Sequence, residues 1–180
     1  VSVRRTAHYF DLRTIAGPPE LLEPIRGQAV RLARSRERYS QMNAGKILSD
    51  TPPPLRWPRR FAVSRTGTID LKALILLPLT LMAQRVSLKA GGEQRNTLDR
   101  LEAAAACGAL SRNRARDLAL AYEIACRFRL DHVLACPDDR RNNDLDPDGL
   151  APYERRLLKS VLLEVQVLRR LLKLEAGVQP

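Results

Sequence analysis

The sequence has few aromatic residues and few glycines: aromatics make up 4% of its 180 residues, and nine residues are glycine. Hydrophobic residues still make up 44%, so a core has to be built from Leu, Ala, Val and Ile. Sheets favour aromatic and β-branched residues, whereas helices favour Leu, Ala, Arg and Glu. The composition therefore predicts a mostly helical protein, in one ordinary domain or one small domain with an appendage.

The sequence also lacks a hydrophobic run long enough to span a membrane. The longest run, residues 73–83, is interrupted by Pro78 and Thr80, whereas a span needs about 20 apolar residues. Residues 1–5 contain neither an initiator Met nor the apolar core of a signal peptide. We therefore expect no membrane association, and we expect this chain to be part of a longer protein.

Cysteine is scarce as well. Three cysteines cannot all pair, and the pattern of a secreted disulfide protein is missing, which favours the cytoplasm. Cys126, His132 and Cys136 could together bind zinc, but the chain has no Cys-x-x-Cys pair at the tight spacing typical of zinc sites. We predict no metal site.

Positive charge is abundant. The net charge is +11, and 26 of the 31 basic residues are Arg. Codon composition can produce such a bias. The bias is also typical of phosphate recognition, because one guanidinium group can bind two phosphate oxygens at once. The charge is not gathered into a run with interleaved aromatics, as single-stranded nucleic-acid binding sites require. We therefore rank nucleic acid last among the partners.

The pattern of residues predicts one strand followed by helices. Residues 7–15 are rich in β-formers, and a lone strand needs a partner. We assign residues 1–17 to the terminal strand of an upstream sheet, residues 18–66 to a helix and a proline-rich connector, and residues 67–180 to a helical bundle. Apolar spacing, caps and helix stops predict the helices over residues 19–48, 70–89, 97–107, 112–134 and 152–175.

Two predicted helices carry cations where their apolar seam continues. One seam leads to Arg85, and another leads to Arg129 and His132, whereas the last helix keeps an aliphatic seam throughout. A cation on an inward face is costly unless something pairs with it. One interpretation is a cavity in which these three side chains face an anionic or polar ligand. The alternative is internal ion pairs or helix ends that meet solvent, with the candidate carboxylates being Asp70, Asp99 and Glu123.

For the remaining candidate residues, simple exposure to solvent is the alternative to a functional role. Asp11, inside the strand-like run, could be a metal ligand or base, although an exposed carboxylate is the commoner case. Asp144, Asp146 and Asp148 lie in a loop that we expect to be solvated. The sequence has no Ser-His-Asp order, no nucleotide-binding Gly-rich loop and no His-Glu-x-x-His motif.

Several segments, in this order, resemble the bacterial family called the putative nucleotidyltransferase substrate-binding domain. They are spread over most of the chain and comprise Phe10-Asp11-Leu12-Arg13, Gly67-x-Ile69-Asp70-Leu71-Lys72, Pro78, Arg85, Asn96-Thr97-x-x-Arg100-Leu101, Arg127-x-Arg129-Leu130-x-His132, Asn143-Asp144 and Leu150-x-x-x-Glu154-Arg155-x-x-Leu158-Lys159.

The resemblance implies a helical bundle packed against a nucleotidyltransferase sheet, with the active site in the cleft between them. It also implies an upstream catalytic domain, similar to the uridylyltransferases that modify the PII nitrogen-signalling protein, and regulatory CBS or cyclic-nucleotide-binding modules. Asp11 would then be a late-strand carboxylate near the cleft. The substrate-binding residues would be Asp70, Lys72, Arg85, Asn96, Arg100, Arg129 and His132.

Nucleotidyl transfer needs carboxylates that hold Mg²⁺ against a triphosphate, in an Asp-x-Asp pair after a Gly-Ser turn. The sequence has no Gly-Ser turn. We therefore expect the chain by itself to be inactive and without a cofactor, and Mg²⁺ and a nucleoside triphosphate to belong to the full-length enzyme. The acceptor could be a protein. The competing hypothesis is a helical protein-interaction or dimerisation module without ligand chemistry.

Overall fold

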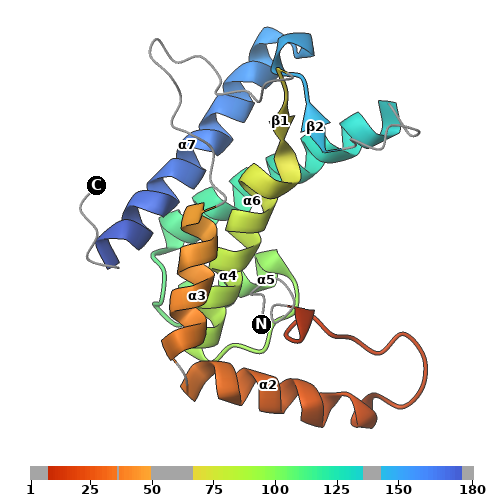
Figure 1. Ribbon diagram of the computed structural model, residues 1–180, viewed down its shortest axis with the longest axis vertical. Helices are drawn as coiled ribbons and strands as arrows, with labels where there is room; N and C mark the ends of the chain where they lie inside the picture. Colours follow the sequence, from red (N-terminus) through yellow and green to blue (C-terminus); the bar gives the residue numbers. More distant parts are fainter. Residues whose placement is uncertain (1–7, 36, 50–66, 136–142, 176–180) are drawn as a thin grey trace. The chain divides into compact units, whose positions relative to one another are not determined.

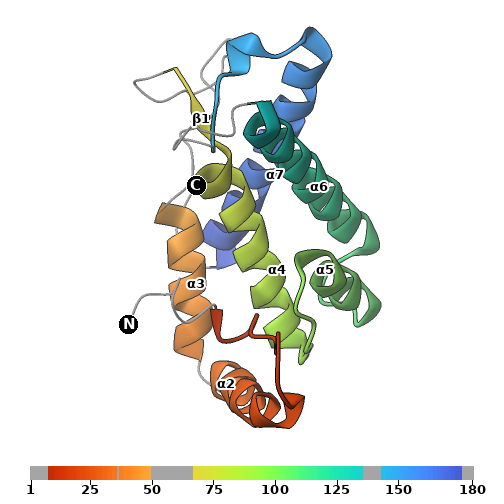
Figure 2. The same cartoon turned by 90° about the vertical axis from the view of Figure 1, so that its right-hand side faces the viewer.

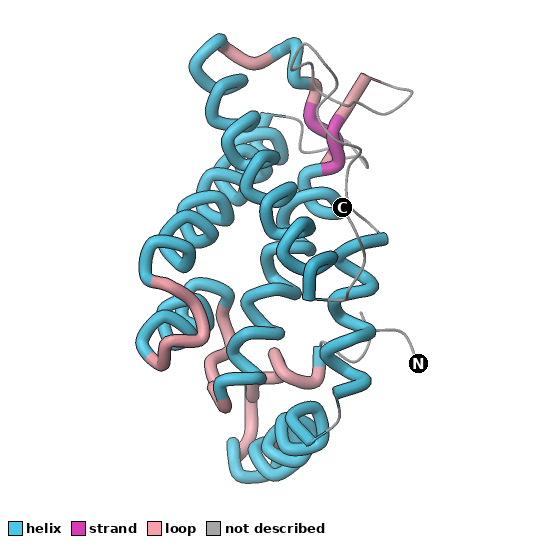
Figure 3. Tube along the Cα trace, turned by 90° about the vertical axis from the view of Figure 1, so that its left-hand side faces the viewer, coloured by secondary structure: helices cyan, strands magenta, loops and turns pink. Residues whose placement is uncertain are grey.

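The computed structural model describes residues 8–35, 37–49, 67–135 and 143–175. The described residues are 77% helical, and they form six α-helices and a small ribbon of two strands (Figures 1 and 3). The prediction of a mostly α-helical bundle is confirmed. The chain divides into two compact units, one made of residues 1–46 and 80–116 and the other of residues 47–79 and 117–180.

The first unit contains helices from both ends of its sequence range. A 3-10 turn, η1 (Pro19–Leu21), leads into α2 (Glu23–Ser35), and α3 (Glu37–Ser49) follows. The single helix predicted over residues 19–48 is therefore two helices. They are joined in this unit by the C-terminal part of α4 (Leu77–Ala90) and by α5 (Thr97–Ala106).

Several predicted helix ends of the first unit are confirmed. Asn96 is the N-cap of α5, and its side chain accepts a hydrogen bond from the backbone N–H of Asp99. Ser111 Oγ accepts from the N–H of Arg114 at 3.2 Å at the start of α6 (Arg112–Ala135). Gly91, just after α4, has a φ of +81°, which an L side chain rarely adopts.

The predicted strand over residues 7–15 is not formed within the described residues 8–15. This segment is a turn followed by irregular chain, with the N–H of Asp11 donating to the carbonyl of His8 at 3.1 Å. A strand needs a neighbour, and neither strand found in the described ranges pairs with this segment. The turn instead buries Phe10, whose ring contacts Tyr39 edge-on at 5.1 Å.

Whether residues 1–17 complete a sheet of another domain stays a prediction, as do the boundaries at residues 18–66 and 67–180. Residues 50–66, which include the proline-rich connector, lie outside the described residues. Phe10 belongs to a small apolar core in the first unit, formed with Val30 and Leu88. Partly buried residues packed against this core are Ala29, Ala33 and Tyr39.

The second unit contains the two-stranded ribbon. Strands β1 (Ile69–Asp70) and β2 (Asp144–Leu145) pair in antiparallel fashion. Ile69 lies opposite Leu145 with both side chains buried, and Asp70 lies opposite Asp144. The loop predicted over residues 137–149 therefore holds a short strand and a 3-10 turn, η3 (Pro147–Gly149), in its described part.

The helical stretch that contains Pro78 changes its helix type shortly before this residue. Residues Lys72–Leu76 form a π-helical turn, η2, before α4, and the N–H of Leu77 donates to the carbonyl of Lys72, five residues earlier. Proline has no N–H to offer to the carbonyl four residues before it, so the usual ladder is interrupted here. Such turns are frequent at functional sites.

The last helix, α7 (Pro152–Glu175), has the bounds that the sequence predicts. Its predicted aliphatic seam is buried throughout, so the prediction is confirmed for Leu158, Val161, Leu162, Val165, Leu168 and Leu172. This helix contacts η2. Burying six aliphatic side chains, each contributing about 1.5–3 kcal/mol, makes α7 the main apolar support of the second unit.

The seam of α6 differs from the predicted one. The sequence predicts a seam through Ala115, Leu118, Tyr122 and Ala125. Tyr122 is only half-buried, and the buried residues are Ala115, Leu118, Ala121, Ala125 and Phe128. The helical period of 3.6 residues allows either Ala121 or Tyr122 to continue the stripe, and the smaller residue faces inwards. Consequently Arg129 lies beside the seam instead of within it.

Among the described residues, one helical stretch, Lys72–Ala90, is long and apolar enough by composition to cross a membrane, and 61% of its most apolar window is buried. This burial is consistent with the core helix of a soluble domain. The absence of a membrane partner stays a prediction.

Candidate functional site

The predicted site residues are divided between the two units. Asp11, Arg85, Asn96 and Arg100 belong to the first unit, and Asp70, Lys72, Arg129 and His132 belong to the second. A single cavity that would hold Arg85 together with Arg129 and His132 therefore stays a prediction. Each unit has its own group of polar side chains.

Arg100 is 3% exposed and uses its guanidinium to hold the N-terminal segment. Its Nη2 forms an ion pair with Asp11 and also donates to the carbonyl of Phe10, and its Nε donates to the carbonyl of Gln94 at 2.9 Å. Asp11 and Arg100, predicted for catalysis and substrate binding, thus bind each other in this chain. Their predicted roles stay predictions.

Asn96 is exposed, and its side chain forms hydrogen bonds at the start of α5. Its Oδ1 caps the helix at the N–H of Asp99, and its Nδ2 donates to the carboxylate of Asp99. This is a reciprocal contact at a helix N-terminus, where side chains satisfy free N–H groups.

Arg85 is a buried cation, as the seam of α4 predicts. It is 8% exposed, and its Nε donates to Ser40 Oγ at 3.0 Å. It lines a partly open cavity of about 700 Å³ between α2, α3 and the C-terminal part of α4, the three helices seen together in Figure 2. The lining residues are Arg31, Ala33, Arg34, Ser35, Tyr39, Ser40, Arg85, Leu88 and Lys89.

The Tyr39 side chain forms a neutral part of this wall. Its hydroxyl donates to Gln84 Oε1 at 2.7 Å. Burial, the largest cause, raises the pKa of Tyr39 to about 12, because a phenolate is poorly solvated there. The wall therefore adds no negative charge near neutral pH.

Sequence reasoning missed the other cations of the cavity. Two signals were available: Arg31 and Arg34 are three residues apart on α2, and Arg85 and Lys89 are four apart on α4. Residues at these spacings share a helix face. That the two faces meet depends on tertiary packing, and no pattern within one helix reveals it.

In the second unit, three segments of the resemblance meet at Asn143. Arg129 Nε donates to Asn143 Oδ1 at 2.7 Å, and the carbonyl of Asn143 accepts from the N–H of Leu71 at 2.8 Å. We call Leu71, Arg129 and Asn143 the Asn143 junction. No described residue other than Asn143 bonds to the Arg129 side chain, so an internal ion pair with Asp70 or Glu123 is not formed.

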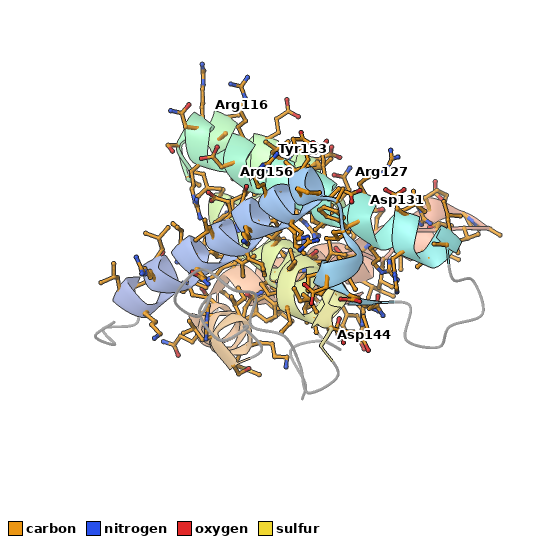
Figure 4. The ribbon with its side chains drawn as sticks, turned by 90° about the horizontal axis from the view of Figure 1, so that it is seen from above. Arg116, Arg127, Asp131, Asp144, Tyr153 and Arg156 are labelled. Carbon is orange, nitrogen blue, oxygen red and sulfur yellow. The ribbon has the colours of Figure 1, made fainter. Side chains whose placement is uncertain are left out.

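Other charged residues lie near the Asn143 junction in the sequence, around β1 and on α6. Asp70 Oδ1 accepts from the N–H of Ala73 at 2.8 Å and caps the helical stretch, and Lys72 is exposed. Arg127 and Asp131 form an exposed ion pair along α6 (Figure 4). Hydrogen bonding to Asp131 raises the pKa of Arg127.

His132 has an unusual environment. It is half-buried, and its Nε2 is buried with no hydrogen-bond partner among the described residues. A buried polar atom without a partner costs free energy, which a ligand could offset.

Within the described residues, no group of three His, Cys, Asp or Glu side chains lies close enough to hold a metal ion. Cys136 lies outside these residues, so the prediction of no zinc site stays a prediction.

Comparison with known proteins gives one match. No curated protein and no solved structure matches the chain. A family model described as "putative nucleotidyltransferase substrate binding domain" matches residues 37–176. This match covers most of the chain, including residues of both units and the whole Asn143 junction, so the chain belongs to the nucleotidyltransferase substrate-binding domain family.

Proposed function

We propose that this chain is the substrate-binding domain of a bacterial signal-transduction nucleotidyltransferase, and that it holds a nucleotide or the acceptor against a catalytic domain. The observation that carries the proposal is the Asn143 junction. It joins residues from three separate segments of the resemblance, within the range of the family match. The name of the family itself implies association with a nucleotidyltransferase domain.

Two features of the second unit support a ligand beside this junction. Arg129 is half-buried and holds Asn143 through Nε, and its terminal nitrogens have no partner among the described residues. His132, three residues further along α6, keeps a buried Nε2 without a described partner. A cation and a ring nitrogen together suit a polar or anionic substrate group.

The wider context belongs to the same proposal. The complete enzyme would use Mg²⁺ and a nucleoside triphosphate in the cytoplasm, under the control of CBS or cyclic-nucleotide-binding modules, and a protein could be the acceptor. Asp11, Asp70, Lys72, Asn96 and Arg100 would act as sequence reasoning predicts. We expect the chain alone to be inactive.

The test is Arg129→Ala, compared with Arg127→Ala. Both remove one arginine from α6, but Arg127 is exposed and bonds only along its own helix among the described residues. We expect Arg129→Ala to weaken binding of nucleoside triphosphates, measured by calorimetry, by about tenfold while helical content by circular dichroism is unchanged. If Arg129→Ala unfolds and no triphosphate or acceptor ever binds the parent chain, the junction is structural and the proposal fails.

A second candidate, a homodimer or protein-interaction module, is favoured by one observation. α7 has a second apolar stripe, which is exposed, at Leu163, Val167, Leu171 and Leu174. Sedimentation of the chain at increasing concentration tests it. A stable dimer that Val167→Glu dissociates would support this candidate.

A further inference from the structure

The cavity of the first unit is strongly positive. Of its nine lining residues, all within the described part of the chain, four are cationic, three carry hydroxyl groups and none is acidic. Arg31, Arg34 and Lys89 are exposed, and Arg85 is buried. Cations brought together without carboxylates repel one another, so this arrangement costs free energy in the absence of an anion.

Three of the four cations in this cavity have no partner among the described residues. Among the described residues, Arg31, Arg34 and Lys89 form no hydrogen bond and no ion pair. Other arginines of the same unit do have carboxylate partners: Arg26 and Arg95 bind Glu23, and Arg100 binds Asp11. Acidic residues are therefore available to this unit and are used elsewhere.

Two of the cationic groups, those of Arg34 and Arg31, lie close to the backbone of their own unit. A methyl group added to Gly91 would lie 2.9 Å from Arg34 Nη2, so this guanidinium lies against the glycine that ends α4. The carbonyl groups at a helix C-terminus attract a cation. The guanidinium of Arg31 lies near Gly27, one turn back along α2, where an added methyl group would be 3.4 Å from Nη1. The guanidinium of Arg34 thus lies at the C-terminal end of α4, and that of Arg31 lies along α2.

Beneath these cations the lining is apolar and packed. Ala33, Tyr39 and Leu88 line the cavity and also belong to the core around Phe10 and Val30. A volume of about 700 Å³ falls within the usual range of small-molecule sites, roughly 300–1,000 Å³. The site therefore suits a compact ligand that has both anionic groups and an apolar or aromatic part.

From this arrangement we infer that the cavity lined by Arg31, Arg34, Arg85 and Lys89 binds a small molecule through a chain of two or more phosphate groups. Each planar guanidinium group can bind two phosphate oxygens at once, and Lys adds a point charge. The hydroxyl of Ser40, which accepts from Arg85, supplies a further donor, whereas the hydroxyl of Ser35 donates to the carbonyl of Leu32. The nucleoside triphosphate of the proposed function and a different phosphorylated effector share this chemistry.

The test is titration calorimetry of the 180-residue chain with inorganic triphosphate, ATP, UTP and adenosine. We expect triphosphate to bind and adenosine not to bind. Arg34→Ala and Lys89→Ala should each weaken triphosphate binding by about tenfold, as the loss of one charge-assisted contact predicts. Lys89→Arg should retain binding. A nucleotide that binds more tightly than triphosphate and competes with it identifies the nucleotide as the ligand, whereas equal affinities show recognition of the phosphate chain alone.

The matched control is Arg116→Ala. Arg116 is exposed and points outwards from α6 (Figure 4), it does not line the cavity, and its loss changes the net charge by the same amount. Circular dichroism of every variant establishes that the fold is retained. The inference is overturned if triphosphate does not bind, if Arg116→Ala weakens binding as much as Arg34→Ala, or if an oligonucleotide binds in place of triphosphate. Since the proposed function is tested at Arg129, failure at Arg34 and Lys89 leaves it standing.

Discussion

The cavity of the first unit and the Asn143 junction of the second use arginine in opposite ways. Arg31 and Arg34 are exposed and have no partner among the described residues, whereas Arg129 bonds to Asn143, which in turn bonds to Leu71. The segments of the family resemblance include all three residues of the Asn143 junction, but of the four cavity cations they include only Arg85. A residue in a family motif can therefore contribute to the fold, while residues outside every motif, such as Arg31 and Arg34, can line an open cavity.

The comparison has an energetic side. An arginine that is hydrogen-bonded in the folded state stabilises it, whereas neighbouring cations without partners destabilise it slightly. Substitutions should therefore separate into those that lower the free energy of unfolding and those that lower ligand affinity alone.

The largest effect is expected for Arg100→Ala, at the buried arginine of the first unit. The substitution leaves the carbonyls of Gln94 and Phe10 without this donor and removes the partner of Asp11. We expect the free energy of unfolding to fall by about 2–4 kcal/mol, measured by chemical denaturation. A change below about 0.5 kcal/mol would mean that the N-terminal segment is not held by Arg100.

The next largest effect is expected in the pH dependence of stability, through Tyr39 in the wall of the cavity. The pKa of Tyr39 is about 12 in the folded chain, against about 10 for an exposed tyrosine. Between these values the unfolded chain releases the proton while the folded chain keeps it, so stability is complete below pH 10 and is lost as the pH rises towards 12. Denaturation midpoints should fall less steeply over this window for Tyr39→Phe than for the parent chain. Equal slopes would show that Tyr39 is exposed.

A smaller effect is expected at the Asn143 junction. Removing the Arg129 side chain deletes one hydrogen bond, so Arg129→Ala should cost about 1 kcal/mol of stability. A double-mutant cycle with Asn143→Ala should give a coupling energy of about 0.5 kcal/mol or more. If the two changes in the free energy of unfolding simply add, Arg129 and Asn143 do not stabilise each other. Arg129 would then resemble the cavity arginines, which have no described partner, and the contrast between the two regions would be lost.

The smallest effect on stability is expected for Arg31→Ala. The side chain is exposed and lies three residues from Arg34, a like charge. We expect a change within about 0.5 kcal/mol, with a slight gain as the favoured direction. A loss above about 1 kcal/mol would reveal a partner for Arg31 and would weaken the case for a ligand site.

Much of the fold follows from residue patterns. The bounds of α7, the cap at Asn96 and the aliphatic seam from Leu158 to Leu172 were all predictable, because they depend on spacing within one helix. The ribbon of β1 and β2 was not, since two-residue strands carry no periodicity. The strand predicted over residues 7–15 was wrong for its described part because β-formers such as Phe10 also suit a turn that buries one ring.

The candidate site was only partly predictable for a similar reason. Arg85 was found because a cation interrupts an apolar seam, and it is buried as expected. Arg34 and Lys89 lie on polar faces that look like ordinary solvated surface until α2 and α4 are placed together. Whether any of these residues binds substrate stays a prediction.

The most direct test of the account is the response of the arginine side chains to inorganic triphosphate, followed by NMR of their Nε–H groups. The account predicts that the signals of Arg31, Arg34 and Arg85 shift together in a saturable manner, while the signal of Arg100 does not move. Uniform small shifts among the 26 arginines, or a leading shift at Arg100, would contradict it, because triphosphate would then be attracted by the net charge or by a different site.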